Sequence, residues 1–159
     1  MACILMHTLI HATPERCFDL SRDAAVHLLS TDHTHERVVA GRSSGLFELG
    51  DAVTWEAVHL GIRQQLEVRI SRFDRPHFFE DTMVRGAFRS MRHEHHFRRD
   101  GNSTIMTDIF DYTVPAGPLG RLFDELCLKS YMTRLLEKRN RVIKAIAEKD
   151  RVTFQASRY

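Results

Sequence analysis

The last long run of the sequence, Pro118 to Lys149, constrains the fold more than any other stretch. It has no internal proline and a single glycine, Gly120, and it is rich in Leu, Arg, Lys, Glu and Ala, which favour helix. At 1.5 Å per residue such a helix extends roughly 45 Å, and its own turns cannot bury its apolar side chains. The helix therefore needs a large partner surface, which the residues before it must supply.

The apolar residues of this run fall on two different faces. One face holds Leu119, Leu122, Phe123 and Leu126. The other, roughly opposite, holds Leu128, Met132, Leu135, Ile143 and Ile146. A straight helix would present a different apolar face at each end. We therefore expect a bend or break near Leu128 to Tyr131, with the first turns covering another part of the molecule.

The residues before the helix predict seven strands and two short helices. The strand-like runs are Ile4 to Ile10, Arg37 to Ala40, Val53 to Leu60, Ile62 to Phe73, Phe78 to Arg85, Phe88 to Arg98 and Thr104 to Val114. Short turns, with Gly61, Gly86 and Gly101 among them, separate the later runs, as in an antiparallel meander. After the first strand, Thr13 before Pro14 and a second start at Ser21 predict two successive helices.

These elements predict an α+β helix-grip fold, with a curved antiparallel sheet of about seven strands around the long C-terminal helix. The sheet must curl around that helix because few other elements can cover its apolar face. The length of 159 residues fits one domain. We expect a single domain over residues 1–150 and a C-terminal tail over 151–159 that frays.

Composition excludes several classes of protein. The net charge is only +2, basic residues are scattered among acids, and no RNA- or DNA-binding motif is present, so we expect no nucleic-acid partner. Three cysteines without a CxxC pair indicate neither a disulfide framework nor a zinc ribbon. The apolar start is too short for a signal peptide and no run is long enough to span a membrane. The sequence therefore predicts a cytoplasmic protein without an integral membrane segment.

Four polar residues are expected to face the interior. Alternation places Asp81, His93 and His95 on the same strand faces as apolar residues, and the aromatic face of the last strand brings in Asp108. Two histidines two residues apart beside carboxylates could ligate a metal or act as general acid and base. They could also form a hydrogen-bonded polar ladder, or orient a ligand. We favour the ladder, and expect no metal and no cofactor.

The remaining histidines show no shared spacing, and we interpret them as surface or packing residues: His7, His11, His27, His33, His35, His59 and His77. Arg139 is different, because it falls within the apolar stripe of the C-terminal helix. Its stem could cover apolar surface while its head reaches water, a bend could move it off the buried face, or it could pair with an inward acid. Our hypothesis is that it pairs with Asp81 or Asp108, since a buried carboxylate needs a partner.

Five segments carry a resemblance to a known family: Ile10–Phe18, Phe79–Asp81, Arg85–Phe88, His93–Phe97 and Asp108–Arg121. They resemble the SRPBCC superfamily of START-like, birch-pollen-allergen-like and polyketide cyclase-like helix-grip domains. The last two are similar to the HxHxF and PxGPLG motifs of a bacterial subfamily. Ala87, Met91 and Cys17 depart from the usual Pro, Trp and Val, which alters the shape of a pocket more than the fold.

The resemblance implies a cavity between sheet and helix for a small hydrophobic or aromatic molecule, such as a lipid, a quinone or a polyketide-like compound. It does not fix the activity. We expect a carrier or sensor whose cavity is lined by Trp55, Leu66, Val68, Phe79, Met83, Phe97, Phe110 and Tyr112. Asp81, His93, His95 and Asp108 would orient a polar end of the ligand.

The loop from Gly41 to Asp51 is expected to act as a lid, with Leu46, Phe47 and Leu49 at the mouth of the cavity. Two other functions stay open. One is a cyclase- or dehydratase-like enzyme without organic cofactor, in which His93 or His95 moves a proton next to Asp81 or Asp108. The other is a protein-interaction module.

Overall fold

The computed structural model describes the backbone of residues 1–156 and, within that range, all side chains except those of residues 121 and 150–156. The elements in chain order are β1 (Ala2–Ile10), α1 (Pro14–Ser21), α2 (Ala24–Ser30), the 3-10 helix η1 (Asp32–Thr34), β2 (Arg37–Gly41), β3 (Ala52–His59), β4 (Ile62–Asp74), β5 (Phe78–Arg85), β6 (Ser90–Asp100), β7 (Ser103–Thr113), α3 (Gly117–Phe123), the π-helix η2 (Asp124–Leu128) and α4 (Lys129–Ala156). In the predicted tail, 151–159, the backbone continues α4 as far as Ala156, and residues 157–159 lie outside the described part.

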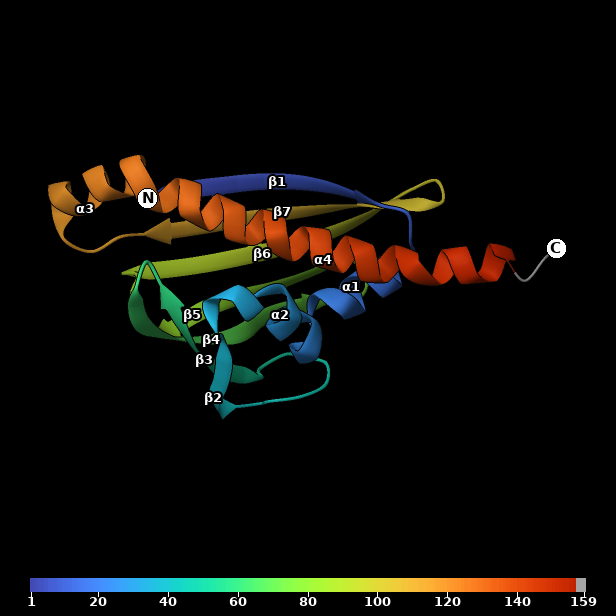
Figure 1. Cartoon of the computed structure of the whole chain (residues 1–159), viewed down its shortest axis with the longest axis horizontal. Coiled ribbons are helices and arrows are strands. Elements are labelled where there is room, and N and C mark those ends of the chain that lie inside the picture. The colour runs from blue at the N-terminus through green and yellow to red at the C-terminus, as the bar shows by residue number, and fades with distance from the viewer. Residues whose placement is uncertain (157–159) are drawn as a thin grey trace.

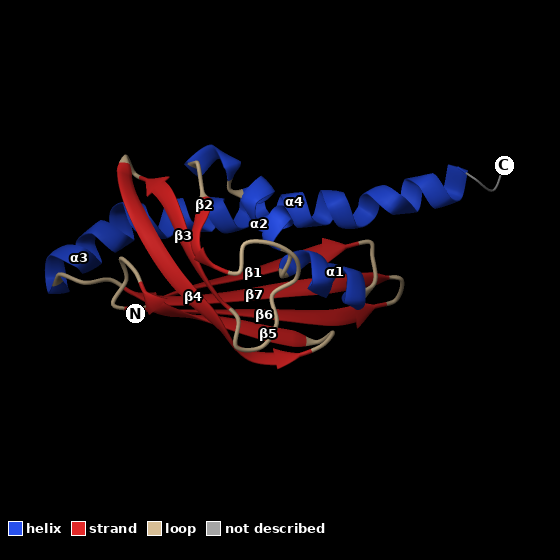
Figure 2. Cartoon of the chain, turned by 90° about the horizontal axis from the view of Figure 1, so that it is seen from below, coloured by secondary structure: helices blue, strands red, loops and turns tan. Residues whose placement is uncertain are grey.

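The seven strands form one antiparallel sheet in the order β1-β7-β6-β5-β4-β3-β2. The sheet curves, and α4 lies along one of its faces, with α1 and α2 beside α4 (Figures 1 and 2). This arrangement confirms the predicted α+β helix-grip fold. Among the described helices, none has the length and apolar character needed to cross a membrane.

Side-chain caps start the two short helices. The hydroxyl of Thr13 accepts a hydrogen bond from the backbone N–H of Arg16 at 3.4 Å, and Pro14 occupies the first turn of α1. The carboxylate of Asp23 accepts one from the N–H of Ala25 at 2.8 Å at the start of α2. Such caps satisfy backbone donors that have no partner within the helix. Both helices therefore begin close to the predicted residues.

The long helical run contains a π-helical turn near the point where its apolar residues move from one face to the other. The π-helix η2 separates α3 from α4 and ends at Leu128, next to the predicted break. A π-helical turn inserts extra backbone and so rotates the residues that follow. At the start of α3 the chain packs closely on itself, because a Cβ at Gly120 would overlap the carbonyl oxygen of Pro115.

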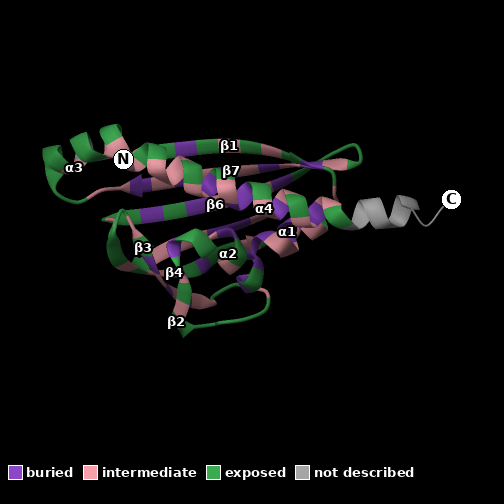
Figure 3. Cartoon of the chain, in the orientation of Figure 1, coloured by how far each residue is buried: buried purple, intermediate pink, exposed green. Residues whose placement is uncertain are grey.

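The core lies between the sheet and the helices (Figure 3). On β6 and β7 every second side chain is buried, including His93, His95 and Asp108 among apolar neighbours. These are the faces predicted to point inward. From α1, Phe18 is fully buried and its ring meets those of Phe73, Phe79 and Phe97 edge-on, with centroids 5.2 to 5.4 Å apart.

Candidate functional site

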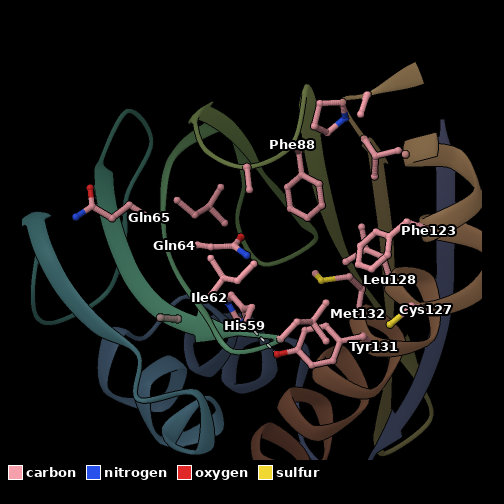
Figure 4. A pocket seen from close by; sticks show the side chains of 18 of the residues that line it. His59, Ile62, Gln64, Gln65, Phe88, Phe123, Cys127, Leu128, Tyr131 and Met132 are labelled. Carbon is pink, nitrogen blue, oxygen red and sulfur yellow. Dashed lines mark hydrogen bonds between the residues drawn. The ribbon is translucent and has the colours of Figure 1, made fainter. Parts of the chain in front are cut away.

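A cavity of about 660 Å³ lies between the curved sheet and the helical segment that contains α3 and η2 (Figure 4). Its walls come from the end of β3, the start of β4, the β5–β6 connection and residues 114–132. The lining is mostly apolar, with Leu66, Phe88 and Met132 among its large side chains. Among the described residues that line it, none is Lys or Arg. An apolar cavity of this kind suits an apolar ligand.

A second cavity, of about 170 Å³, lies between the sheet, the α1–α2 segment and α4. Five residues line both cavities, namely Glu36, Trp55, His59, Leu66 and Met132. The two cavities therefore adjoin.

A buried cluster of charged groups lies on one side of the smaller cavity. His95 bridges two carboxylates: its Nδ1 is 2.8 Å from Oδ1 of Asp108, and its Nε2 is 3.1 Å from Oδ2 of Asp81. Nε2 of His93 is 3.1 Å from the same Oδ1 of Asp108. Each ring nitrogen of His95 therefore faces a carboxylate oxygen, which accepts hydrogen bonds.

Asp108 is also held from the helix side. Arg139 donates to its Oδ1 at 3.3 Å, and Asn140 donates to its Oδ2 at 2.7 Å. Arg139 is 8% exposed and also donates to the backbone oxygen of Ser21 at 3.1 Å. The hypothesis that Arg139 points at the sheet and pairs with an inward acid is thus confirmed, with Asp108 as the partner.

These contacts set the protonation of the acids. Burial alone would raise the pKa of Asp108, but hydrogen bonds from His93 and His95 and the charge of Arg139 hold it well below its usual range. Burial is likewise outweighed at Asp81, whose pKa is lowered chiefly by the hydrogen bond with His95. Burial and the neighbouring His95 lower the pKa of His93 to about 4, against the effect of Asp108. Both carboxylates of the cluster are therefore ionised, and their neighbours are the guanidinium of Arg139 and the two histidines.

Asp81, His93 and His95 each offer a donor atom within 4.8 Å of the other two, a spacing that could hold a metal ion. The same atoms have protein partners, however. The Nε2 of His95 and the Oδ2 of Asp81 bond to each other, and His93 bonds to Asp108. Arg139 also adds a positive charge beside them, which opposes a second cation. The geometry therefore favours the polar ladder over a metal centre.

We expect purified protein to hold far less than one equivalent of zinc or iron, because the ladder satisfies these donors without a metal. Removing metals with EDTA should leave the melting temperature unchanged. His95→Ala, in contrast, should lower the free energy of unfolding by about 1–3 kcal/mol, because both acids lose a partner. Elemental analysis and thermal melts measure both effects. A stoichiometric metal that the His93→Ala/His95→Ala double variant no longer holds would contradict the ladder.

The structure distributes the predicted lining residues between three places. Trp55 and Leu66 line both cavities. The smaller cavity is also lined by Val68, Phe79, Asp81, His93, His95 and Phe110. Phe97 and Tyr112 belong to the hydrophobic core, Met83 packs partly buried against it, and Asp108 is fully buried beneath Arg139 and Asn140.

The predicted lid residues also lie in different surroundings. Phe47 is 7% exposed and its ring meets that of Trp55 at 6.0 Å, so it is a core residue that also lines the smaller cavity. Leu49 is 62% exposed, and Leu46 forms a β-bridge with Asp23. The backbone N–H of Phe47 donates to the oxygen of Arg22 at 2.9 Å and anchors the loop inward. The role of this loop as a lid stays a prediction.

Sequence reasoning missed Glu36 and His59, which line both cavities, and His27, which lines the smaller one. His59 carried a usable signal, because alternation along β3 puts it on the same face as Trp55. In the structure its Nδ1 is 2.9 Å from the hydroxyl of Tyr131 (Figure 4). Glu36 and His27 belong to no apolar alternation, and their place follows only from the fold.

Neither a protein-family profile nor a curated protein sequence matches the chain. Solved structures do. TTHA0849 from Thermus thermophilus is 18% identical, with a TM-score of 0.72 over 92% of this chain and 99% of that chain. A START superfamily protein from Mycobacterium smegmatis is 10% identical, with a TM-score of 0.69 over 92% of this chain and 97% of that chain.

A plant protein shares the architecture as well. Ginseng major latex-like protein 151 from Panax ginseng is 16% identical, with a TM-score of 0.66 over 92% of this chain and 97% of that chain. Likeness at such low identity concerns the arrangement of helices and strands, not the chemistry of the site. The chain therefore has the helix-grip fold that these bacterial and plant proteins share, over nearly its whole length.

Proposed function

We propose that the protein binds a small hydrophobic or aromatic ligand in the larger cavity and acts as a cytoplasmic carrier or sensor. The observation that carries this proposal is the cavity of about 660 Å³ with its largely apolar lining. Ligand sites for small molecules are typically about 300–1,000 Å³ and mostly apolar with a few polar groups. A lipid, a quinone or a polyketide-like compound would fit this description.

Exposed apolar side chains that line the cavity support reversible binding of a ligand. Leu119 and Phe123 of α3 line the cavity, yet they are 77% and 47% exposed. On the opposite wall Ile62, at the start of β4, also lines the cavity and is 63% exposed. Apolar side chains that are left in water beside an apolar cavity gain contacts when a ligand enters.

Acid–base catalysis is a second candidate, which one observation favours. Asp81, His93 and His95 line the smaller cavity, so a ligand that extended into it would reach them. Asp108 would then orient His93, whose low pKa leaves it neutral and able to accept a proton. We rank this second because the same groups already satisfy one another. If a captured ligand were converted by the protein and left unchanged by His93→Gln, catalysis would take first place.

Capture of the natural ligand tests the leading proposal directly. Protein purified from its own host would be analysed by native mass spectrometry. A small molecule that stays bound would be released by denaturation and identified by its mass. A hydrophobic small molecule at up to one equivalent is the expected result.

A larger side chain in the cavity should weaken ligand binding. Ala57 lines the larger cavity, whereas its neighbour Val58 lies on the other face of β3 and is 36% exposed. We expect Ala57→Phe to weaken binding of the neutral apolar dye N-phenyl-1-naphthylamine by about tenfold or more, and Val58→Phe to leave it unchanged. Dye fluorescence measures the affinity, and thermal melts check that both variants fold. Equal affinity in both variants would place the dye elsewhere.

A further inference from the structure

The junction of the two cavities holds a buried nitrogen without a partner. Among the described side chains, Nε2 of His27 is the one buried polar atom that makes no hydrogen bond. The ring of His27 stacks on Trp55 with centroids 4.1 Å apart and planes at 21°, which fixes its position. A buried polar atom needs a partner. The described residues give this nitrogen no hydrogen bond, so a bound ligand can supply one.

Glu36 lies next to this nitrogen. Its Oε2 is 3.4 Å from Nε2 of His27, and its side chain is 9% exposed although it lines both cavities. Burial opposes ionisation, but the adjacent His27 and Thr31 bring the pKa of Glu36 below its usual value. Glu36 is therefore an ionised acceptor at the edge of an apolar cavity. A buried carboxylate of this kind is stable only when donors surround it.

The remaining polar groups of this wall are neutral. His59 and Tyr131 bond to each other at 2.9 Å (Figure 4). Burial lowers the pKa of His59 and raises that of Tyr131, so neither carries a charge at neutral pH.

Since no described residue that lines the larger cavity is Lys or Arg, Glu36 is the charged group that a ligand end would meet there. Arg22 and Arg139 line the smaller cavity, but they are already paired with Glu48 and Asp108. The junction therefore disfavours an anionic ligand end.

A hydroxyl group can bond to Glu36 and to His27 at once. It can donate its hydrogen to Glu36 while its oxygen accepts from the N–H of His27. An ammonium group could satisfy Glu36, but it has no lone pair to accept from His27. A carbonyl or ether oxygen could accept from His27, but it has no hydrogen to donate to Glu36.

We propose that Glu36 and His27 form a recognition site for a hydroxyl group, and that the ligand is an apolar alcohol or phenol whose body fills the larger cavity. This inference rests on the proposed binding function and narrows the class of ligand. Its apolar part would lie between Leu66, Phe88 and Met132, and its hydroxyl would lie at the junction with the smaller cavity.

A matched pair of compounds tests this site. 4-Octylphenol and its methyl ether have the same apolar body, but only the phenol can donate a hydrogen bond. Each would displace N-phenyl-1-naphthylamine from the full chain. We expect the wild type to bind the phenol about tenfold or more tightly than the ether, because a hydrogen bond to a buried charge is at stake.

In Glu36→Met that preference should fall to about twofold or less, while the ether binds as well as before. Glu137→Met removes an exposed carboxylate of α4 and should keep the full preference. His27→Phe retains an aromatic ring on Trp55, removes the nitrogen, and should also reduce the preference. It gives an independent readout if Glu36→Met does not fold.

Three results would contradict the binding function, the hydroxyl site or the residues that form it, and each result is distinct. If the wild type bound neither compound nor the dye, the proposed binding function would fail. If it bound phenol and ether equally, the cavity would bind ligands but the hydroxyl site would be wrong. A preference that survived both Glu36→Met and His27→Phe would place hydroxyl recognition at other residues.

Discussion

Replacing Arg139 by Met is expected to lower the free energy of unfolding by about 3–5 kcal/mol, because it leaves the buried carboxylate of Asp108 without its guanidinium. In the folded protein the two groups are 3.3 Å apart and Asp108 is fully buried. A loss of this size corresponds to a fall of about 6–20 °C in the melting temperature of a domain of this length. Arg141→Met, which changes an exposed arginine two residues further on, should change the melting temperature little.

A double-mutant cycle separates the pair from the general effect of altering the core. Asp108→Asn should also be destabilising, because it weakens bonds from the histidines as well as from Arg139. In combination with Arg139→Met it should cost at least about 1 kcal/mol less than the sum of the single losses. Chemical denaturation gives these free energies. Losses that add within a few tenths of a kcal/mol would mean that Arg139 stabilises the fold without Asp108.

Replacing Phe47 by Ser should cost about 3–5 kcal/mol of folding free energy, as other large-to-small changes of buried aromatic residues do. The side chain is 7% exposed and packs on Trp55, so the change leaves a cavity and buries a hydroxyl. Leu49→Ser is the matched control in the same loop. Because Leu49 is 62% exposed, its replacement should change stability by no more than about 0.5 kcal/mol.

Thermal melts of the two loop variants, followed by dye titration, decide between a core residue and a lid. A core residue predicts a large fall in melting temperature for Phe47→Ser alone. If that variant kept its melting temperature and lost dye affinity, Phe47 would act as a lid after all.

The strands could be predicted because apolar and polar residues alternate along a strand when one face of its sheet is buried. The same rule placed His93 and His95 inside. Arg139 could be predicted to pair because an arginine within an apolar stripe needs an acid. In each case the sequence pattern that supports the prediction lies within a single strand or helix.

The junction of the cavities could not be predicted in this way. His27 belongs to α2, Glu36 precedes β2 and Tyr131 belongs to α4, so no single periodicity relates them. The place of Phe47 in the loop from Gly41 to Asp51 could not be predicted for a related reason. Its glycines and apolar residues describe a covering loop equally well whether Phe47 closes a mouth or packs inward on Trp55. Only the tertiary contacts distinguish the two.

The position of β1 also bears on how the chain reaches this fold. Strands β2 to β7 pair with neighbours in sequence, but β1 pairs with β7, and the side chains of His7 and Thr107 that bond across this pair are 100 residues apart. Closing so long a loop costs conformational entropy before any contact compensates for it. We expect the meander of β2 to β7 to form early and the β1–β7 pairing late. During synthesis, β1 therefore stays unpaired until β7 has been made, after the other five strands.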